Sequence, residues 1–172
     1  YYGPDVVYTN TQIPGAAQGL FVSIPLFLWA IPEAPTLFLN ILSFLSLLFF
    51  AKYVLYRVKG LPVWLVYGLV FLSPMTLYFS TRVVNPSYVV VLAFPFFVAW
   101  FESLSFYRNR WMQQWVCFLI MGVTTTLIMQ LHLSWVLLFP LTAFSFYRVL
   151  TLDKSQFFRL AGFWILGAVI GM

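Results

Sequence analysis

Long apolar stretches, separated by short polar breaks, run through most of this 172-residue chain. The longest uncharged stretch, Trp111 to Tyr147, holds 37 residues and no Asp, Glu, Lys or Arg. As one straight helix it would measure ~56 Å, nearly twice the ~30 Å hydrocarbon core of a bilayer. The chain therefore has to turn inside this stretch, and the polar residues near Met129–Ser134 mark the turn. The same turn carries the only histidine of the chain, His132.

The other polar breaks divide the chain into seven apolar segments that predict helices. Their ranges are 14–30, 34–56, 62–79, 86–106, 112–129, 133–149 and 157–172. Asn85 and Pro86 predict a helix start, because Asn caps a helix well and Pro suits its first position. The pattern predicts an all-α fold: a single transmembrane domain, 1–172, forming a polytopic helical bundle of about six spanning helices plus one short interfacial or re-entrant helix. Because the chain opens in a loop-like sequence and ends within an apolar segment, we interpret it as an internal fragment of a larger protein.

Charge gives the predicted helices an orientation. Eight of the nine Lys and Arg residues lie in or beside three alternate loops: Lys52, Arg57 and Lys59; Arg108 and Arg110; Arg148, Lys154 and Arg159. The loops between them hold Glu33, Arg82 and His132. Cytoplasmic loops of membrane proteins carry an excess of Lys and Arg, so the first set is predicted to be cytoplasmic and the second to face outward. Arg82 is then the single basic residue on the outer side.

The short segment 14–30 is predicted to lie on the outer face rather than to cross. Residues 1–51 contain no Lys or Arg, which is unexpected for a cytoplasmic flank. The segment is also marginal in length for a span and contains Pro25. We therefore expect a juxtamembrane helix at 14–30, preceded by an outer loop at 1–13.

Composition excludes several classes of protein. Hydrophobic residues make up 63% of the chain and charged residues 8%, whereas soluble domains carry about 25% charged residues. The net charge of +5 does not indicate nucleic-acid binding, because the basic residues stand at the ends of apolar segments instead of forming one patch. The sequence lacks phosphate-loop, dinucleotide and zinc motifs and has no Cys/His metal cluster. It predicts no cofactor and no metal ligands, with a divalent cation left open.

Four polar residues are the candidates for substrate binding: Arg82, Asn85, Gln130 and His132. The planar guanidinium of Arg82 suits a bidentate grip on phosphate, although an arginine at the end of a span can also reach for lipid headgroups. Asn85 either caps a helix or contacts substrate. His132 can bind phosphate or sugar hydroxyls, carry a proton, or only bridge two helices, and Gln130 shares these alternatives. Another polar residue, Glu102, is expected to pair with Arg108 or Arg110.

Three short motifs, in order, resemble the GT-C superfamily of glycosyltransferases, in the branch of the protein O-mannosyltransferases, the lipid A aminoarabinose transferase and the Rgt-type sugar transferases. Pro14-Gly15 resembles the opening of that family's juxtamembrane segment. The run from Leu72 to Ser87, LSPMTLYFSTRVVNPS, resembles its "LSP … YSR … WNPS" segment, and Met129–Ser134 resembles its "QLHLS" segment. Ala16 and Val84 depart from the family pattern, which often has proline and tryptophan there.

The resemblance implies a membrane enzyme that moves a sugar from a polyprenyl-phosphate carrier to a glycan, lipid or protein acceptor. It implies the bacterial inner membrane, with the active site on the outer face, and no nucleic-acid partner. The family's essential acid lies near the start of the first outer loop, so the catalytic base is expected upstream of Tyr1 and the catalytic residue is unknown here. Two alternatives stay open: a transporter or flippase fragment for a lipid-linked or small polar substrate, and a non-catalytic membrane scaffold.

Overall fold

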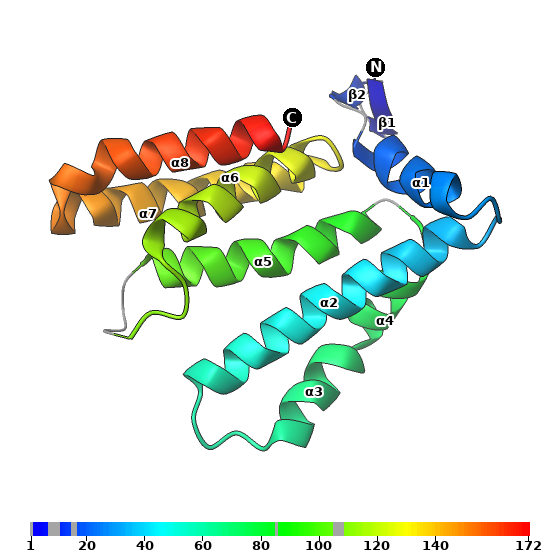
Figure 1. Ribbon diagram of the computed structural model, residues 1–172, viewed down its shortest axis with the longest axis horizontal. Helices are drawn as coiled ribbons and strands as arrows, with labels where there is room; N and C mark the ends of the chain where they lie inside the picture. Colours follow the sequence, from blue (N-terminus) through cyan, green and yellow to red (C-terminus); the bar gives the residue numbers. More distant parts are fainter. Residues whose placement is uncertain (1, 7–10, 15–16, 85, 105–108) are drawn as a thin grey trace.

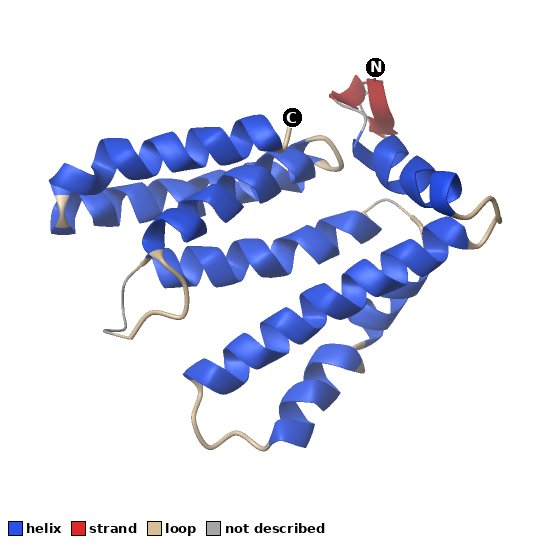
Figure 2. Cartoon of the chain, viewed as in Figure 1, coloured by secondary structure: helices blue, strands red, loops and turns tan. Residues whose placement is uncertain are grey.

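The computed structural model describes residues 2–6, 11–14, 17–84, 86–104 and 109–172 (Figure 1). Within these residues the chain is predominantly helical, as Figure 2 shows. The α-helices are α1 (Ala17–Leu28), α2 (Ala34–Arg57), α3 (Val63–Phe71), α4 (Pro74–Thr81), α5 (Ser87–Ser103), α6 (Gln114–Met129), α7 (Leu138–Leu152) and α8 (Phe157–Ile170). Two short 3-10 helices, η1 (Leu133–Leu137) and η2 (Lys154–Gln156), precede α7 and α8. The all-α prediction is thus confirmed for the described part, apart from one pair of strands.

The strands lie where the sequence predicted an outer loop at 1–13. β1 (Tyr2–Val6) and β2 (Thr11–Pro14) pair antiparallel, with Asp5 opposite Gln12 and Val6 opposite Thr11. The sequence prediction missed this hairpin because neither strand shows a clear alternation of apolar and polar residues. The chain then enters α1, a helix of 12 residues and about 18 Å, which is too short to cross a bilayer.

Predicted segment 62–79 was wrong as a single helix, because it is broken at Leu72–Ser73. α3 ends at Phe71 and α4 begins at Pro74, and the two axes differ by 55°. Proline has no backbone N–H and its ring clashes with the preceding turn, so it starts a helix readily and cannot continue one. Ser73 takes the extended conformation expected of the residue before proline.

On length and composition, two helical stretches among the described residues could cross a membrane. They are Ala34–Arg57, which is α2, and Leu133–Leu152, which joins η1 to α7; the bent pair of α3 and α4 would be a third. α5 and α6 are apolar but shorter, with 17 and 16 residues. The prediction of a membrane protein is therefore supported, whereas the prediction of about six spanning helices is supported only in part.

The main hydrophobic core joins α5, α6, α7 and α8. Its buried members include Phe96 of α5, Phe118 and Met121 of α6, and Leu160 of α8. Cys117 is buried in the same core. From α2 to α8 the chain runs back and forth, with the bent pair of α3 and α4 making a single pass, so most loops gather at two ends of the bundle (Figure 1).

Glycines let α6 and α8 approach until their backbones touch. A Cβ atom added to Gly167 would lie 2.1 Å from the carbonyl oxygen of Leu119, and one added to Gly122 would lie 2.1 Å from that of Trp164. Gly171, one turn beyond Gly167, faces the same helix. Small residues four positions apart are a known way for membrane helices to pack closely without a hydrophobic driving force.

Candidate functional site

The loop between α4 and α5 is closed by a single buried hydroxyl. Ser87, which is fully buried, donates from Oγ to the carbonyl oxygen of Arg82 at 2.5 Å and accepts the N–H of Val84 at 3.2 Å. The N–H of Ser87 in turn donates to the carbonyl of Val84. These bonds fix the backbone that carries Arg82. Ser87 was missed as a positioning residue at sequence level, where the helix start was assigned to Asn85 and Pro86.

Arg82 follows the last residue of α4 and is exposed. Its guanidinium carbon lies 4.9 Å from the centre of the Tyr78 ring, one helical turn earlier. Stacking on an aromatic face restrains the side chain while leaving the edge of the guanidinium available for hydrogen bonds. Asn85, the second candidate of this loop, lies outside the described residues.

Gln130 and His132 form the turn after α6. The Gln130 amide is buried and its Nε2 donates to the carbonyl of Gly171 at 2.6 Å, which ties the end of α6 to the end of α8. His132 stands at the start of η1, where its Nδ1 accepts the N–H of Ser134 at 3.1 Å. Because Nδ1 accepts, the neutral imidazole carries its proton on Nε2, which is the atom left to donate to a ligand.

One small apolar cluster joins the two loops. Leu131, beside His132, and Val83, beside Arg82, both pack with Tyr88 in a cluster that also includes Ala17 of α1 and Leu39 of α2. The structure therefore brings the 82–84 loop and the 130–132 turn to the same end of the bundle (Figure 1). Within the described residues, no hydrogen bond or ion pair joins the side chains of Arg82, Gln130 and His132 to one another.

α1 is held against this cluster by an aromatic stack. The rings of Phe21 and Tyr88 lie 4.8 Å apart and nearly parallel, and the Tyr88 hydroxyl donates to the carbonyl of Phe21 at 3.4 Å. The short helix thus covers the end of the bundle that carries the candidate residues. Its exposed side keeps large apolar residues such as Phe27 and Leu28, which suits a helix lying in a membrane interface.

Two adjoining cavities lie between α2 and the bent pair of α3 and α4. The larger, about 460 Å³, is lined almost entirely by apolar side chains: Phe44, Leu48, Trp64, Tyr67, Gly68, Phe71 and Leu72. The smaller, about 140 Å³, shares Phe44 and Phe71 with it and adds Asn40, Leu47, Leu77, Ser80 and Thr81. Together they form an apolar groove with a polar end that stops one residue before Arg82.

Asn40 is a buried polar group in this groove that the sequence analysis missed. Among the described residues its Oδ1 is inaccessible to solvent and accepts no hydrogen bond. An unpaired buried amide oxygen costs about 1–3 kcal/mol, so a donor from a bound molecule would be stabilising there. The available signal was its position, because Asn40 is the only amide side chain in the predicted span 34–56.

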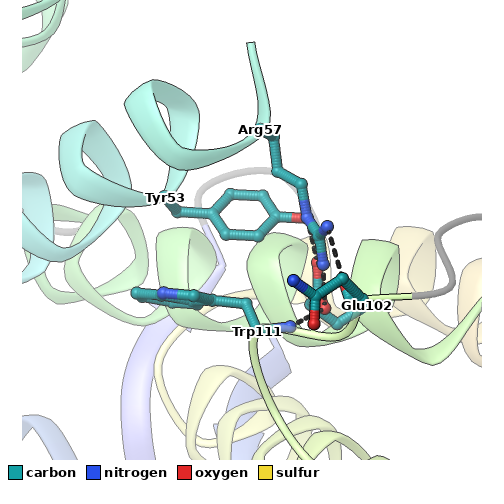
Figure 3. Close-up of polar contacts among 5 residues, drawn as sticks. Tyr53, Arg57, Glu102 and Trp111 are labelled. Atoms are coloured by element: carbon teal, nitrogen blue, oxygen red, sulfur yellow. Dashed lines mark hydrogen bonds and ion pairs between the residues drawn. The ribbon is translucent and has the colours of Figure 1, made fainter. Parts of the chain in front are cut away.

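A second polar cluster occupies the opposite end of the bundle (Figure 3). Glu102 of α5 forms a buried ion pair with Arg57 of α2, and also accepts the Tyr53 hydroxyl at 2.7 Å and the N–H of Trp111 at 2.8 Å. Arg57 donates further to the carbonyl of Asn109 at 2.8 Å. The sequence did not predict Arg57 as a partner of Glu102, and Arg108, one of the two partners it did predict, lies outside the described residues.

In the part of the chain that the structure describes, no group of three or more His, Cys, Asp or Glu side chains is placed to hold a metal ion. The comparisons with known proteins add no relative. No protein-family model, no curated protein and no solved structure matches the chain.

Proposed function

We propose that this chain is the membrane part of a glycosyltransferase that moves a sugar from a polyprenyl-phosphate carrier to an acceptor on the outer face of the membrane. One observation carries the proposal: an apolar groove between α2 and α3 ends at Ser80 and Thr81, next to the exposed guanidinium of Arg82. A polyprenyl phosphate has the matching arrangement, because its long apolar tail suits the groove and the phosphate at one end of the tail suits the guanidinium. The motif resemblance supports the same function from the sequence.

The proposed chemistry assigns one task to each feature. The groove holds the first isoprene units of the tail, and Arg82 binds the phosphate, which is both the anchor and the leaving group. Negative charge grows on the phosphate oxygen as the sugar leaves, so a cation fixed at that position lowers the barrier. None of the four candidate residues is assigned as the base that activates the acceptor.

His132 is proposed to donate from Nε2 to the phosphate or to a sugar hydroxyl. One N–H of the Gln130 amide is engaged by the carbonyl of Gly171, and this bond fixes the buried side chain against the end of α8. We therefore assign Gln130 mainly to positioning the turn that carries His132. Asn85 keeps its proposed role as a further polar contact in the loop after Arg82.

The proposal includes an orientation. With six crossings and α1 lying on the outer surface, residues 1–13, Arg82 and His132 face outward, while Lys59, Arg110 and Lys154 face the cytoplasm. The partition of eight basic residues to one side of the predicted topology supports this arrangement. Single cysteines at positions 12 and 82 of the intact protein should be labelled by an impermeant reagent added outside, and a cysteine at position 154 should be labelled only from the cytoplasmic side. Labelling of position 12 from the cytoplasmic side alone would refute the placement of α1.

The function is tested on Arg82. Arg82→Ala should lower transfer from a polyprenyl-phosphate sugar about 100-fold, the typical cost of removing one electrostatic stabiliser of a transition state. Arg82→Lys keeps the charge, loses the planar fork, and should lose about ten-fold, the equivalent of one charge-assisted hydrogen bond. Lys52→Ala, which removes a basic residue near the C-terminal end of α2, is the matched control and should keep full activity. Full activity of Arg82→Ala would exclude a role in transfer and would leave Arg82 only the role of contacting lipid headgroups.

A double-mutant cycle tests the shared site. If Arg82 and His132 act on one phosphate, the losses from Arg82→Ala and His132→Ala should be non-additive, because groups that serve one site couple. Strictly additive losses would leave His132 as a residue that packs between helices.

A second function, transport or flipping of a lipid-linked substrate, is favoured by the 55° break between α3 and α4. Broken helices line the substrate sites of many transporters. Vesicles that contain the intact protein and a lipid-linked sugar distinguish the two. Movement of the lipid across the bilayer without sugar transfer would favour the transporter.

A further inference from the structure

A second cavity, of about 360 Å³, lies at the end of the bundle opposite Arg82, where the N-termini of α6 and α8 meet. Its wall contains two arginines, Arg110 and Arg159, and none of its lining residues is acidic. The nearest carboxylates described belong to Glu102 and Asp153, and the charge of Asp153 also attracts Arg159. Glu102 accepts from Arg57 and from the N–H of Trp111, and Asp153 accepts from Ser155 and Gln156.

The polar acceptors in the wall are already used by the wall itself. Arg110 donates to Gln114 at 3.1 Å, Arg159 donates to Gln156 at 2.7 Å, and the indole N–H of Trp115 donates to Gln113. Guanidinium and indole groups can only donate, so each glutamine must present its carbonyl oxygen to its partner. Each of the three glutamine side-chain oxygens thus already accepts one hydrogen bond from the wall, and the two arginines give the cavity its positive charge.

The backbone around Arg110 is fixed on both sides. The carbonyl of Asn109 accepts from Arg57, and the N–H of Trp111 donates to Glu102, so the buried ion pair of Figure 3 holds both neighbours of Arg110. Arg110 is exposed, yet its Cα cannot move far without breaking these bonds. A ligand therefore meets an arginine whose position is already ordered, which lowers the entropic cost of binding.

We propose that this cavity binds the phosphate headgroup of an anionic phospholipid from the adjacent leaflet. Two guanidinium groups match one phosphate, and basic pockets between membrane helices bind such headgroups by this chemistry. Lipid is favoured over a soluble anion because half of the wall is apolar, formed by Trp111, Met112 and Trp115. Tryptophan rings are typical of the level where headgroups meet acyl chains. Phe158, beside Arg159, is 84% exposed and extends the apolar surface. The proposal does not depend on the glycosyltransferase assignment.

The test uses the intact protein, purified in detergent and titrated with phosphatidylglycerol or phosphatidylcholine while binding is followed by native mass spectrometry. The wild-type protein should bind phosphatidylglycerol and not phosphatidylcholine. Arg110→Gln and Arg159→Gln should each weaken that binding about five-fold, and the double variant about 30-fold. Arg110→Lys and Arg159→Lys keep the charge and should lose less. Lys59→Gln removes one charge from the same end of the bundle, outside the cavity, and should change nothing.

Three outcomes would overturn the proposal. Equal affinity of the wild-type protein for the two lipids would refute a site that selects an anionic headgroup. That comparison needs no variant. An equal loss in Lys59→Gln would mean a diffuse attraction by surface charge. Binding of inorganic phosphate as tight as that of phosphatidylglycerol would make the occupant a soluble anion.

Discussion

The two sides of the bundle are packed in opposite ways. α6 and α8 touch backbone to backbone at Gly122 and Gly167, and half of the 16 residues of α6 are buried. On the other side, α3 has one buried residue, Val66, and α4 has none. Gly68 of α3 would meet nothing within 4 Å if it gained a Cβ. Gly122 and Gly167 thus allow two helices to pack closely, whereas Gly68 lines the groove.

The difference separates two tasks. The closely packed side carries the turn with Gln130 and His132, which needs a fixed position. The open side offers the groove proposed for a long, flexible tail, which needs room more than precise fit. Among the described residues, polar bonds connect α2 to α5 at two places: the ion pair of Arg57 and Glu102, and the bond from the Ser46 hydroxyl to the carbonyl of Val91 at 2.6 Å.

The largest effect is expected where the ion pair is broken. Glu102→Gln keeps the shape of the side chain and leaves Arg57 buried without its counter-charge, so the free energy of unfolding should fall by about 3–5 kcal/mol. Glu33→Gln, an exposed acid at the start of α2, is the control and should change it by less than about 0.5 kcal/mol. Reversible unfolding in mixed detergent micelles measures both. Similar values for the two variants would mean that the ion pair does not hold the sides together.

The next effect contrasts the glycines directly. Gly167→Ala places a methyl group against the carbonyl of Leu119, so α6 and α8 must separate, at a cost of about 1–3 kcal/mol. Gly68→Ala meets open space and removes a flexible residue from a helix, so it should be neutral or stabilise by about 0.5–1 kcal/mol. The same unfolding measurement applies, and equal costs at the two positions would contradict the packing contrast.

A larger residue in the groove should separate stability from function. Gly68→Phe fills part of the apolar cavity of about 460 Å³ and should change the free energy of unfolding by less than about 1 kcal/mol. Transfer from a long-chain donor should fall because the tail loses its place, while a donor with a very short chain should be affected less. A uniform loss with both donors would place the tail elsewhere. Gly162→Phe, on open surface of α8, is the control.

The smallest effect concerns the turn between α7 and α8. Hydrogen bonds from Ser155 and Gln156 hold the pKa of the Asp153 carboxyl below its usual value. A lowered pKa in the folded state stabilises the fold above the ordinary pKa of Asp, and this contribution disappears as the pH falls through the lowered value. Asp153→Ala should therefore lower the unfolding temperature slightly at neutral pH and not at all in strong acid. An equal difference at both pH values would assign the effect to something other than the carboxylate.

The sequence predicted helices well where charge or proline marks their ends. α2 was expected at 34–56 and spans Ala34–Arg57, since Glu33 and Arg57 flank a mostly apolar stretch whose one charged residue is Lys52. The break at Pro74 was missed although the residue was visible, because the segment 62–79 had the length of a span. The GxxxG spacing of Gly167 and Gly171 was likewise present and unused.

Other features could not be read from the chain alone. Arg57 and Glu102 are 45 residues apart, and nothing local says which basic residue meets a buried acid. Whether a glycine touches a neighbouring helix or lines a cavity depends on tertiary packing, as Gly167 and Gly68 show. The four candidate site residues were chosen for their chemistry. The fold places three of them at one end, and the fourth, Asn85, lies outside the described residues.

The ion pair of Arg57 and Glu102 also has a consequence for how the protein is assembled. Forty-five residues separate the partners, which at about 5–20 residues per second is about 2–9 seconds of synthesis. During that time Arg57 is not yet joined to Glu102, so the position of α2 relative to α5 is not yet fixed. Once Glu102 is in place, α2 and α5 are joined at one level. The order of synthesis thus means that this ion pair fixes α2, an early helix, only after α5 has been made.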